Sequence, residues 1–383
     1  MAYLFETEDH AAIRASTRRF AEAHIAPFGA AWEEDEEFPV ELYRAAASAG
    51  VTGIGYPEDV GGQGGDLSHV LIAADELIQA GRSVGTAVGL GSHGIALPPI
   101  VRFGTPEQQR RFVTPCLTEG KIAALAVTEP GGGSDVASLT TRAELDGDHY
   151  VVTGAKTFIT SGARADFLTC AVRTGGSGHS GISLLVIERG TPGFSVGRKL
   201  RKTGWWASDT AELHFDGCRV PVENRIGLEH GAFPMIMKNF AGERLMLAAQ
   251  CVSIAELAYR EAITYARGRN AFGKPLTGFQ VTRHKLADMV TRIAAARALV
   301  SEAVTRVLAP GGDIAASGLA AMAKNAATDM CSFVCDQAVQ LHGGYGYMRE
   351  TLVERLYRDA RLYPIGGGTR EIMNEVIAKT EGY

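Results

Sequence analysis

The middle of the chain, from Tyr150 to Ile187, reads YVVTGAKTFITSGARADFLTCAVRTGGSGHSGISLLVI. It contains three short runs of β-branched or apolar residues, at 150–153, 167–172 and 182–187, with glycine-containing segments between them. Short strands separated by turn residues are typical of a β-barrel or β-sandwich. The pattern therefore predicts a central β domain over residues 121–225.

Helical periodicity flanks this region on both sides. The N-terminal side is rich in alanine, and the apolar side chains of Ile13, Phe20 and Ala21 recur at near-helical spacing. Long helical segments with short connections, typical of a helix bundle, follow the β region at 233–267, 282–308, 314–341 and 349–363. We therefore expect an α+β protein with an N-terminal helical domain at 1–120, the β domain, and a C-terminal four-helix bundle at 226–383.

The overall composition is that of a globular protein and excludes several classes of function. Hydrophobic residues make up 46% and charged residues 21% of the 383 residues, close to the averages for folded domains. The net charge of −5 gives no global electrostatic reason to bind nucleic acid or an anionic membrane. No apolar run is long enough to predict a membrane span, and the acidic start shows no signal or transit peptide pattern. We expect a cytoplasmic protein.

Two patterns resemble binding sites that the surrounding sequence does not support. The six cysteines form no CxxC pair and no zinc ligand set, so we expect no metal site and six reduced, mostly buried thiols. Residues 89–94 (GLGSHG) fit GxGxxG, but the dinucleotide motif needs a strand before it and a helix opening from it. Because helical sequence precedes these glycines, we interpret them as positions of close helix packing.

Three polar segments are candidates for ligand contact. The loop TEPGGGSD at 128–135 follows an apolar run, and its glycines allow backbone N–H groups to approach a planar or anionic ligand, although an ordinary turn has the same composition. GAKTFITSG at 154–162 places an aromatic residue beside two hydroxyl groups. RGRNAFGK at 267–274 could hold a pyrophosphate through bidentate contacts, or be a solvated helix end whose cations complement the helix dipole.

One acidic residue, Glu243, has no basic partner at helical spacing on its own segment. The residues three and four positions away are Asn239, Phe240, Met246 and Leu247, so no intrahelical ion pair accounts for the carboxylate. A carboxylate on an apolar helix face is desolvated, which raises its pKa and suits it to removing a proton. The alternative is a tertiary salt bridge, for example with the neighbouring Arg244.

Two glycine-rich breaks lie between helical segments near the C-terminus, QLHGGYGY at 340–347 and PIGGGTRE at 364–371. At such breaks the backbone can approach a cofactor or another subunit. Together with the segments above, and in the same order over nearly the whole chain, they resemble the acyl-CoA dehydrogenase family. The stretches similar to family signatures are 127–135, 269–273, 340–344, 345–349 and 359–371.

The resemblance implies a homotetramer (a dimer of dimers) with FAD at a subunit interface and an acyl-CoA between the helices and the β domain. It assigns to the flavin site Leu125, Val127, Thr128, Gly133, Ser134, Phe158, Ile159, Thr160, Thr369 and Glu371. It assigns to the diphosphate and adenosine of a neighbouring subunit's FAD Arg269, Phe272, Gln280, Gln340, Gly343 and Gly344. Phe158 stands where many members have tryptophan, so the aromatic character is kept with less surface.

The position of the catalytic base separates two groups within the family. Many members carry a glutamate one residue before a Gly-Thr pair in the C-terminal loop, where this chain has Gly367. Members similar to the long-chain and isovaleryl-CoA dehydrogenases take it from a bundle helix, in a Glu-Arg-Leu segment, and this chain has Glu243-Arg244-Leu245. The resemblance therefore implies Glu243 as the base. It implies substrate contacts for Ser134, Arg244, Gly367 and Gly368.

The implied reaction is α,β-desaturation of a long-chain or branched acyl-CoA to the trans-2-enoyl-CoA, with electrons passed to an electron-transfer flavoprotein. Residues 198–213 and 279–289 are most similar to the long-chain member, whereas Gly366 stands where straight-chain members usually have tyrosine and leaves room for a branch. An acyl-CoA oxidase or flavin monooxygenase of the same fold remains an alternative, as does a non-catalytic acyl-CoA-binding scaffold. Rapid peroxide production would favour the oxidase, and a colourless protein would favour the scaffold.

Overall fold

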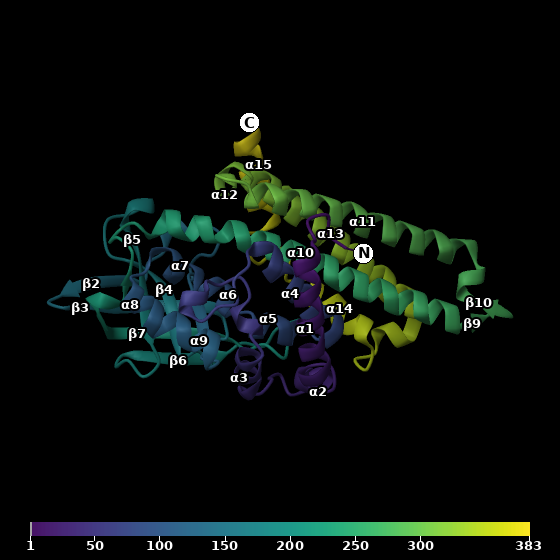
Figure 1. The fold of residues 1–383 in the computed structure, drawn as a ribbon, viewed down its shortest axis with the longest axis horizontal. Coiled ribbons are helices and arrows are strands. Elements are labelled where there is room, and N and C mark those ends of the chain that lie inside the picture. The colour runs from purple at the N-terminus through teal and green to yellow at the C-terminus, as the bar shows by residue number, and fades with distance from the viewer. Residues whose placement is uncertain (1) are drawn as a thin grey trace.

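A computed structural model of the chain describes residues 2–383, apart from the side chains of residues 313 and 314. Figure 1 shows an elongated molecule with the large central sheet at one end and the long C-terminal helices, with a small hairpin at their tip, extending to the other. One hydrophobic core runs through all three parts of the chain and includes Leu71, Leu185 and Leu245. A second core cluster, which includes Phe112 and Ile236, fixes the short N-terminal helices against the sheet and the start of the C-terminal helices.

The N-terminal part is helical, as predicted. Its helices are α1 Glu8–His24, α2 Gly29–Glu34, α3 Glu41–Ser48, α4 Leu67–Gly81, α5 Val84–Leu90, α6 His93–Ala96, α7 Pro98–Phe103, α8 Pro106–Gln108 and α9 Thr114–Thr118. Helix α4 packs on both α1 and the C-terminal helix α10. Gly89 lies in α5, where a β-carbon would come within 2.6 Å of the Phe38 ring. Gly89 is therefore a position of close packing in α5, whereas a β-carbon on Gly94 would meet no atom within 4 Å.

The middle of the chain forms one continuous sheet of eight strands. The strands are β1 Ala123–Ala126, β2 Arg142–Asp146, β3 His149–Thr160, β4 Phe167–Arg173, β5 Ile182–Glu188, β6 Phe194–Lys199, β7 Thr210–Pro221 and β8 Arg225–Ile226. They pair in the order β6-β7-β3-β2-β4-β5-β8, and β1 pairs in parallel with β4. The three apolar runs that predicted the β domain form the central strands β3, β4 and β5.

The C-terminal part contains three long helices and shorter ones. Its elements are α10 Ala232–Gly268, β9 Asn270–Ala271, β10 Lys274–Pro275, α11 Gln280–Leu308, α12 Gly312–Ala315, α13 Ser317–His342, α14 Leu352–Ala360 and α15 Arg370–Glu381. Helix α13 is central and packs on α10, α11, α14 and α15. The fourth segment of the expected bundle is the short α14, and the glycine-rich loop after it separates a further helix, α15, that we did not predict.

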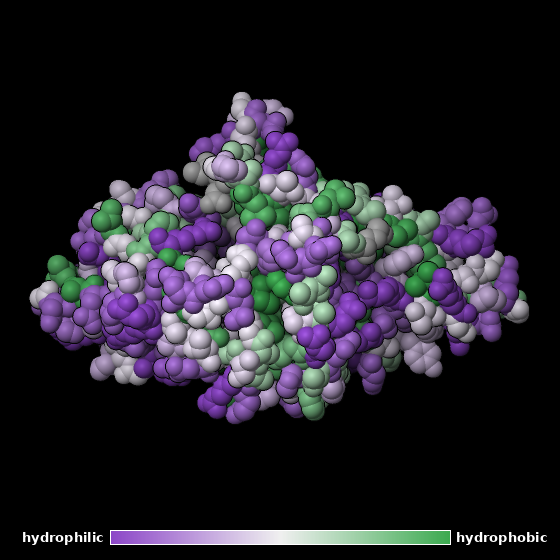
Figure 2. Space-filling model, in the orientation of Figure 1, coloured by the Kyte–Doolittle hydropathy of each residue, from purple (hydrophilic) through white to green (hydrophobic). Residues whose placement is uncertain are grey.

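Surface and cysteine properties agree with the composition. All six cysteines are buried and free of disulfides, which confirms the expected buried thiols. No single helix in residues 2–383 is long and apolar enough to cross a membrane, although the bent pair Val84–Leu90 and His93–Phe103 reaches that length and composition together. Figure 2 shows hydrophobic residues dispersed in small groups among hydrophilic ones on the visible face.

Candidate active site

Glu243 lies on α10 as a half-buried residue whose carboxyl group points one oxygen into the protein. Its Oε2 atom is buried and receives no hydrogen bond from the described residues. Burial raises the pKa of this carboxyl group, and the nearby charges of Lys324 and Arg244 act in the opposite direction without cancelling the effect. The tertiary salt bridge that we considered as an alternative is not formed with any described residue. Glu243 is therefore a desolvated carboxyl group without an ionic partner.

The loop at 364–369 lies directly against this carboxyl group. A β-carbon on Gly367 would be 3.4 Å from Oε1 of Glu243 and 2.5 Å from Cδ1 of Leu247. The φ angles of Gly367 and Gly368 are +64° and +96°, a backbone conformation that favours glycine. The Gly367 N–H donates no backbone hydrogen bond within the described residues. The loop thus presents a free N–H donor beside a buried carboxyl group.

Lys324, on α13, completes this cluster, although it was not predicted from the sequence as a site residue. Its side chain is almost fully buried, and its Nζ donates hydrogen bonds to the carbonyl oxygens of Gly366 and Gly368. Burial lowers the pKa of Lys324 to about 8, against the opposing effect of Glu243. The available signal was a lone lysine within the alanine-rich stretch AAMAKNAA at 320–327, because lysine is rarely buried without a specific partner.

The glycine-rich loop at 128–135 is fixed to strand β3. The Thr157 N–H donates to the Thr128 carbonyl oxygen at 2.9 Å. Nζ of Lys156 donates to the Val127 carbonyl oxygen at 3.0 Å and to Oε1 of Glu129 at 2.9 Å. These bonds bring together the two segments, 128–135 and 154–162, that the sequence analysis identified separately.

Phe158 projects from the sheet beside this loop. Its side chain is 68% exposed, and its φ angle of +59° falls where the pairing of β3 with β7 shifts register between Lys156 and Ile159. Such a bulge redirects a side chain. In the loop, a β-carbon on Gly131 would meet no atom within 4 Å, and one on Gly133 only a side-chain methyl group at 3.6 Å. An exposed aromatic ring beside an open glycine loop fits the planar ring of a flavin.

The other residues assigned to the flavin differ in how they are placed. Ser134 is exposed and Thr160 is half-buried. Val127 and Ile159 are buried in the two core clusters, so the backbone of these two is what a ligand can reach. Leu125 packs in the same cluster as Phe240 of α10. This cluster therefore includes residues from the strand that leads into the glycine loop and from the helix that carries Glu243.

Comparison with known proteins identifies the family. Three family models match successive parts of the chain: "Acyl-CoA dehydrogenase, N-terminal domain" at residues 7–120, "middle domain" at 124–218 and "C-terminal domain" at 231–381. The chain belongs to the acyl-CoA dehydrogenase family. Enzymes of this family are FAD-dependent oxidoreductases that act on a CH–CH bond, and the resemblance found in the sequence is confirmed.

Individual relatives cover nearly the whole chain. Isobutyryl-CoA dehydrogenase, mitochondrial, from Bos taurus is 39% identical over 94% of this chain and 86% of its own length. Long-chain specific acyl-CoA dehydrogenase, mitochondrial, from Sus scrofa is 39% identical over 97% of this chain and 86% of its own length. A solved structure described as a probable acyl CoA dehydrogenase from Mycobacterium abscessus is 49% identical, with a TM-score of 0.96 over 98% of this chain and 99% of that one.

A solved relative also contains the cofactor. The structure of an acyl-CoA dehydrogenase from Bacillus anthracis complexed with FAD is 30% identical to this chain, with a TM-score of 0.92 over 98% of this chain and 68% of that one. The exposed Phe158 ring and the open glycine loop are the features of the present acyl-CoA dehydrogenase that fit this cofactor.

Thr369 and Glu371 lie at the start of α15, directly after the glycine loop. The Thr369 side chain caps the helix by accepting a hydrogen bond from the Ile372 N–H at 3.4 Å, and Glu371 is exposed in the first turn. Residues 367–369 therefore place a free N–H group and a helix start next to the buried acid. Among the side chains that the structure describes, no group of three or more His, Cys, Asp or Glu residues is arranged to hold a metal ion.

The remaining cofactor residues form a second group at the far end of α10 (Figure 1). They are Arg269, Phe272, Gln280, Gln340, Gly343 and Gly344. The Tyr265 and His342 rings stack at 4.3 Å and join the ends of α10 and α13. Arg269 follows Glu243 by 26 positions, about 39 Å along a helix. One chain of this acyl-CoA dehydrogenase therefore does not bring the two groups together.

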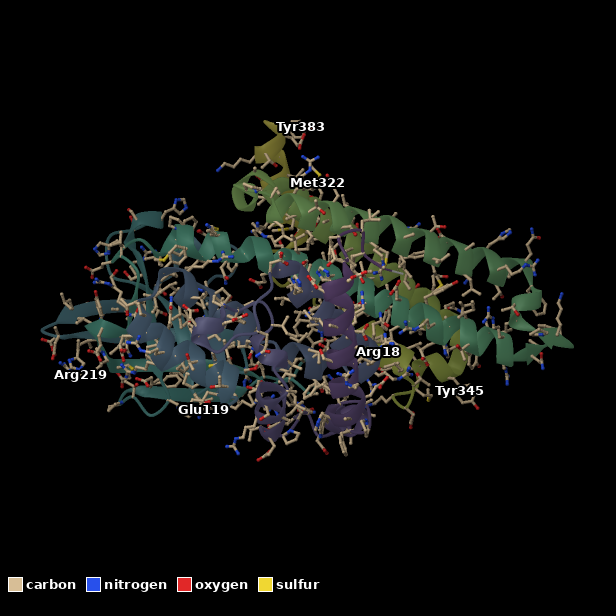
Figure 3. The ribbon with its side chains drawn as sticks, viewed as in Figure 1. Arg18, Glu119, Arg219, Met322, Tyr345 and Tyr383 are labelled. Atoms are coloured by element: carbon tan, nitrogen blue, oxygen red, sulfur yellow. The ribbon has the colours of Figure 1, made fainter. Side chains whose placement is uncertain are left out.

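The second group is open to its surroundings. Phe272, next to the hairpin strand β9, is 96% exposed, and β-carbons on Gly343 or Gly344 would meet no atom within 4 Å. Tyr345, which follows them, is labelled in Figure 3 on the lower edge of the helical half of the molecule, away from the sheet. The Phe272 ring makes one edge-to-face contact, with the Phe279 ring at 6.3 Å between centroids, and is otherwise open to its surroundings.

Proposed function

We propose that Glu243 is the base that removes the α proton of an acyl-CoA thioester, so that the enzyme forms the trans-2-enoyl-CoA. The observation that carries this proposal is the buried Glu243 carboxyl group, unpaired among the described residues and set against the Gly367 loop. Desolvation makes a carboxylate a stronger base, and a position beside the reacting carbon replaces a chance encounter in water. The loop at 364–369 reads PIGGGT and contains no acidic side chain, and position 367 is glycine. The loop therefore cannot supply the base.

The negative charge that develops as the proton leaves must be stabilised on the thioester oxygen. The Gly367 N–H donates no backbone hydrogen bond within the described residues, which supports its assignment as a donor to that oxygen. FAD held by Phe158 and the loop at 128–135 supplies the acceptor for the hydride of the β carbon. Arg244 is largely buried, with an Nε that has no partner among the described residues, which supports a contact with the CoA part of the substrate.

We propose a long-chain or branched acyl group as the substrate. A β-carbon on Gly366 would meet only Leu362, at 3.8 Å or more, so glycine leaves open space at this position of the loop, which supports room for a branched acyl group. The relatives named above act on isobutyryl-CoA, which is branched, and on long-chain acyl-CoA. Both kinds of substrate therefore belong in the same assay.

We propose that the enzyme works as a homotetramer and passes electrons to an electron-transfer flavoprotein. Arg269 of the second group of FAD residues is about 39 Å along α10 from Glu243, which lies beside the loop that leads to Thr369, and this separation supports completion of each FAD site by a second copy of the chain. A solved structure described as the electron transferring flavoprotein of Acidaminococcus fermentans includes a chain 36% identical to this one, which supports the choice of acceptor.

A panel of straight and branched acyl-CoA thioesters, scored by flavin bleaching under nitrogen, tests the function. We expect bleaching by at least one long-chain or branched thioester, and only slow peroxide formation when the assay is repeated in air. Gly366→Val serves as a matched variant, because position 366 has no positive φ and tolerates a side chain. It should reduce bleaching by branched thioesters more than by straight ones. Absence of bleaching by every member of the panel would contradict the proposal.

A further inference from the structure

Lys324 is a buried cation whose two hydrogen bonds go to backbone carbonyl groups of a single loop, at Gly366 and Gly368. No carboxylate of the described residues forms an ion pair with it. Keeping a desolvated ammonium group in such a place is costly, and what it provides that an apolar side chain could not is the pair of hydrogen bonds to the loop. We propose that Lys324 is a positioning residue, which holds these carbonyl groups so that the intervening Gly367 N–H faces the thioester oxygen beside Glu243.

The direction of the Gly367 N–H follows from the geometry of the peptide bond. In a trans peptide, the carbonyl of one residue and the N–H of the next point in opposite directions, and none of the described peptide bonds is cis. Because the Gly366 carbonyl points to Nζ of Lys324, the Gly367 N–H points away from it. That N–H donates no backbone hydrogen bond within the described residues, so it is available to a ligand.

The loop needs such an anchor because its own sequence does not fix its conformation. Gly366, Gly367 and Gly368 follow one another, and glycine loses more conformational freedom on ordering than any other residue. An ammonium group with three donors on a flexible stem can bind two carbonyl groups at once. Removing it leaves the carbonyl groups without these bonds and allows the Gly367 N–H to turn.

The inference rests on the proposed function and is tested on the FAD-loaded enzyme with trans-2-hexadecenoyl-CoA, a long-chain enoyl thioester, as the bound ligand. A donor to the thioester oxygen polarises the carbonyl bond, which is measured as a lowering of its infrared stretching frequency relative to the free ligand. Lys324→Met removes the donors with little change in length, and Lys324→Gln retains a shorter donor if the first variant folds poorly. Asn325→Ala is the matched control, because Asn325 neighbours Lys324 on α13 and instead bonds to Asn374 at 2.9 Å.

We expect Lys324→Met to retain FAD and bind the ligand, to lose the lowering of the carbonyl frequency, and to reduce flavin about tenfold more slowly or worse. Both the frequency shift and the rate of flavin reduction of Lys324→Gln should lie between those of Lys324→Met and the wild type. Asn325→Ala should keep the full frequency shift. A full frequency shift in Lys324→Met would overturn the inference, even if the pH dependence of the rate had moved, because Lys324 would then act on Glu243 alone. If the wild type binds and desaturates no acyl-CoA, the proposed function itself fails, which is a different result.

Discussion

Oε1 of Glu243 lies 3.4 Å from the position that a β-carbon on Gly367 would occupy. Two places for a catalytic carboxyl group, on the helix and on the loop, therefore compete for the same space. A chain that places its acid on α10 needs a small residue at 367, and this chain has the smallest one there. The glycine that rules out a base on the loop is also what gives the helix acid its room.

The first prediction concerns substitution of that glycine. Gly367→Ala should lower the free energy of unfolding by about 1–2 kcal/mol, because φ is +64° and the new methyl group would lie 2.5 Å from Cδ1 of Leu247. Denaturant unfolding measures the change. Gly268→Ala is the control, since a β-carbon there meets no atom within 4 Å and φ is not positive. Equal stability of the two variants would contradict the described loop conformation.

The second prediction concerns the buried ion pair under the flavin loop. Besides Lys156, the Glu129 carboxylate accepts hydrogen bonds from the backbone N–H groups of Thr140 and Thr141. Burial alone would raise the pKa of Glu129, but Lys156 and these bonds hold it at about 2. Lys156→Met leaves the carboxylate buried without its cation and should cost about 3–5 kcal/mol of stability and weaken FAD binding.

A double variant tests whether Lys156 and Glu129 stabilise one another beyond the separate contribution of each side chain. Adding Glu129→Gln to Lys156→Met removes the unpaired charge, so the two together should cost less than Lys156→Met and Glu129→Gln summed. Thermal unfolding and FAD release measure the effects. Strict additivity would show that the two side chains do not stabilise one another. In the wild type the pair's contribution should be lost as the pH falls from about 5 toward 2, because the folded-state pKa is depressed.

The third prediction concerns two buried acids that hold the loop between β6 and β7. Oδ1 of Asp359 accepts from the Trp205 N–H at 2.6 Å, and Oε2 of Glu33 accepts from the Trp206 N–H at 3.2 Å. Burial and the charge of Glu33 raise the pKa of Asp359 to about 8. The folded state then keeps a proton that the unfolded state releases near pH 4.

Stability should therefore fall as the pH rises from about 4 to 8, by up to about 1.4 kcal/mol per pH unit for one proton. Asp359→Asn should flatten this dependence, because its amide oxygen can still accept from the Trp205 N–H and the group does not ionise. Melting temperatures between pH 5 and pH 8 test it, with the exposed Asp329→Asn as the control. If the melting temperature of Asp359→Asn fell with pH as steeply as that of the wild type, the prediction would be wrong.

The sequence was most informative where the conformation or role of a residue depends on its near neighbours in the chain. Glu243 could be identified because no basic residue follows at helical spacing, and the apolar runs from 150 to 187 predicted β3, β4 and β5 correctly. The helix α15 was missed because the glycine-rich loop before it was interpreted as part of a cofactor site. Helix α14, Leu352–Ala360, is shorter than the expected segment 349–363 because the residues before Leu352 and after Ala360 form turns and do not continue the helix.

Contacts between distant segments could not be predicted in the same way. Nothing in the spacing of Lys324 and Gly366 shows that α13 brings the lysine onto the loop, because that contact depends on how α13 packs in the folded chain. Likewise, Ile159 lies between two residues assigned to the flavin, but the bulge in β3 turns its side chain into the core. Tertiary packing determines where such side chains lie, and the spacing of residues in one sequence does not show how distant segments pack together.

The fourth prediction concerns the pH dependence of the reaction. Glu243 must be ionised to accept a proton, and burial raises the pKa of its carboxyl group. The rate of flavin reduction by acyl-CoA should therefore rise with pH through a midpoint above the ordinary glutamate value of about 4.3. Stopped-flow measurements under nitrogen across the pH range provide the test. A midpoint at or below the ordinary value would mean that this carboxyl group is not desolvated during the reaction.

The most direct measurement is flavin bleaching by acyl-CoA in Glu243→Gln. The amide fills the same space and cannot accept the α proton, so the variant should bind FAD and acyl-CoA like the wild type while its flavin stays oxidised under nitrogen. Glu261→Gln, on the same helix and paired with Arg82 at 2.9 Å, should bleach normally. Bleaching of Glu243→Gln at the wild-type rate would show that another group removes the proton.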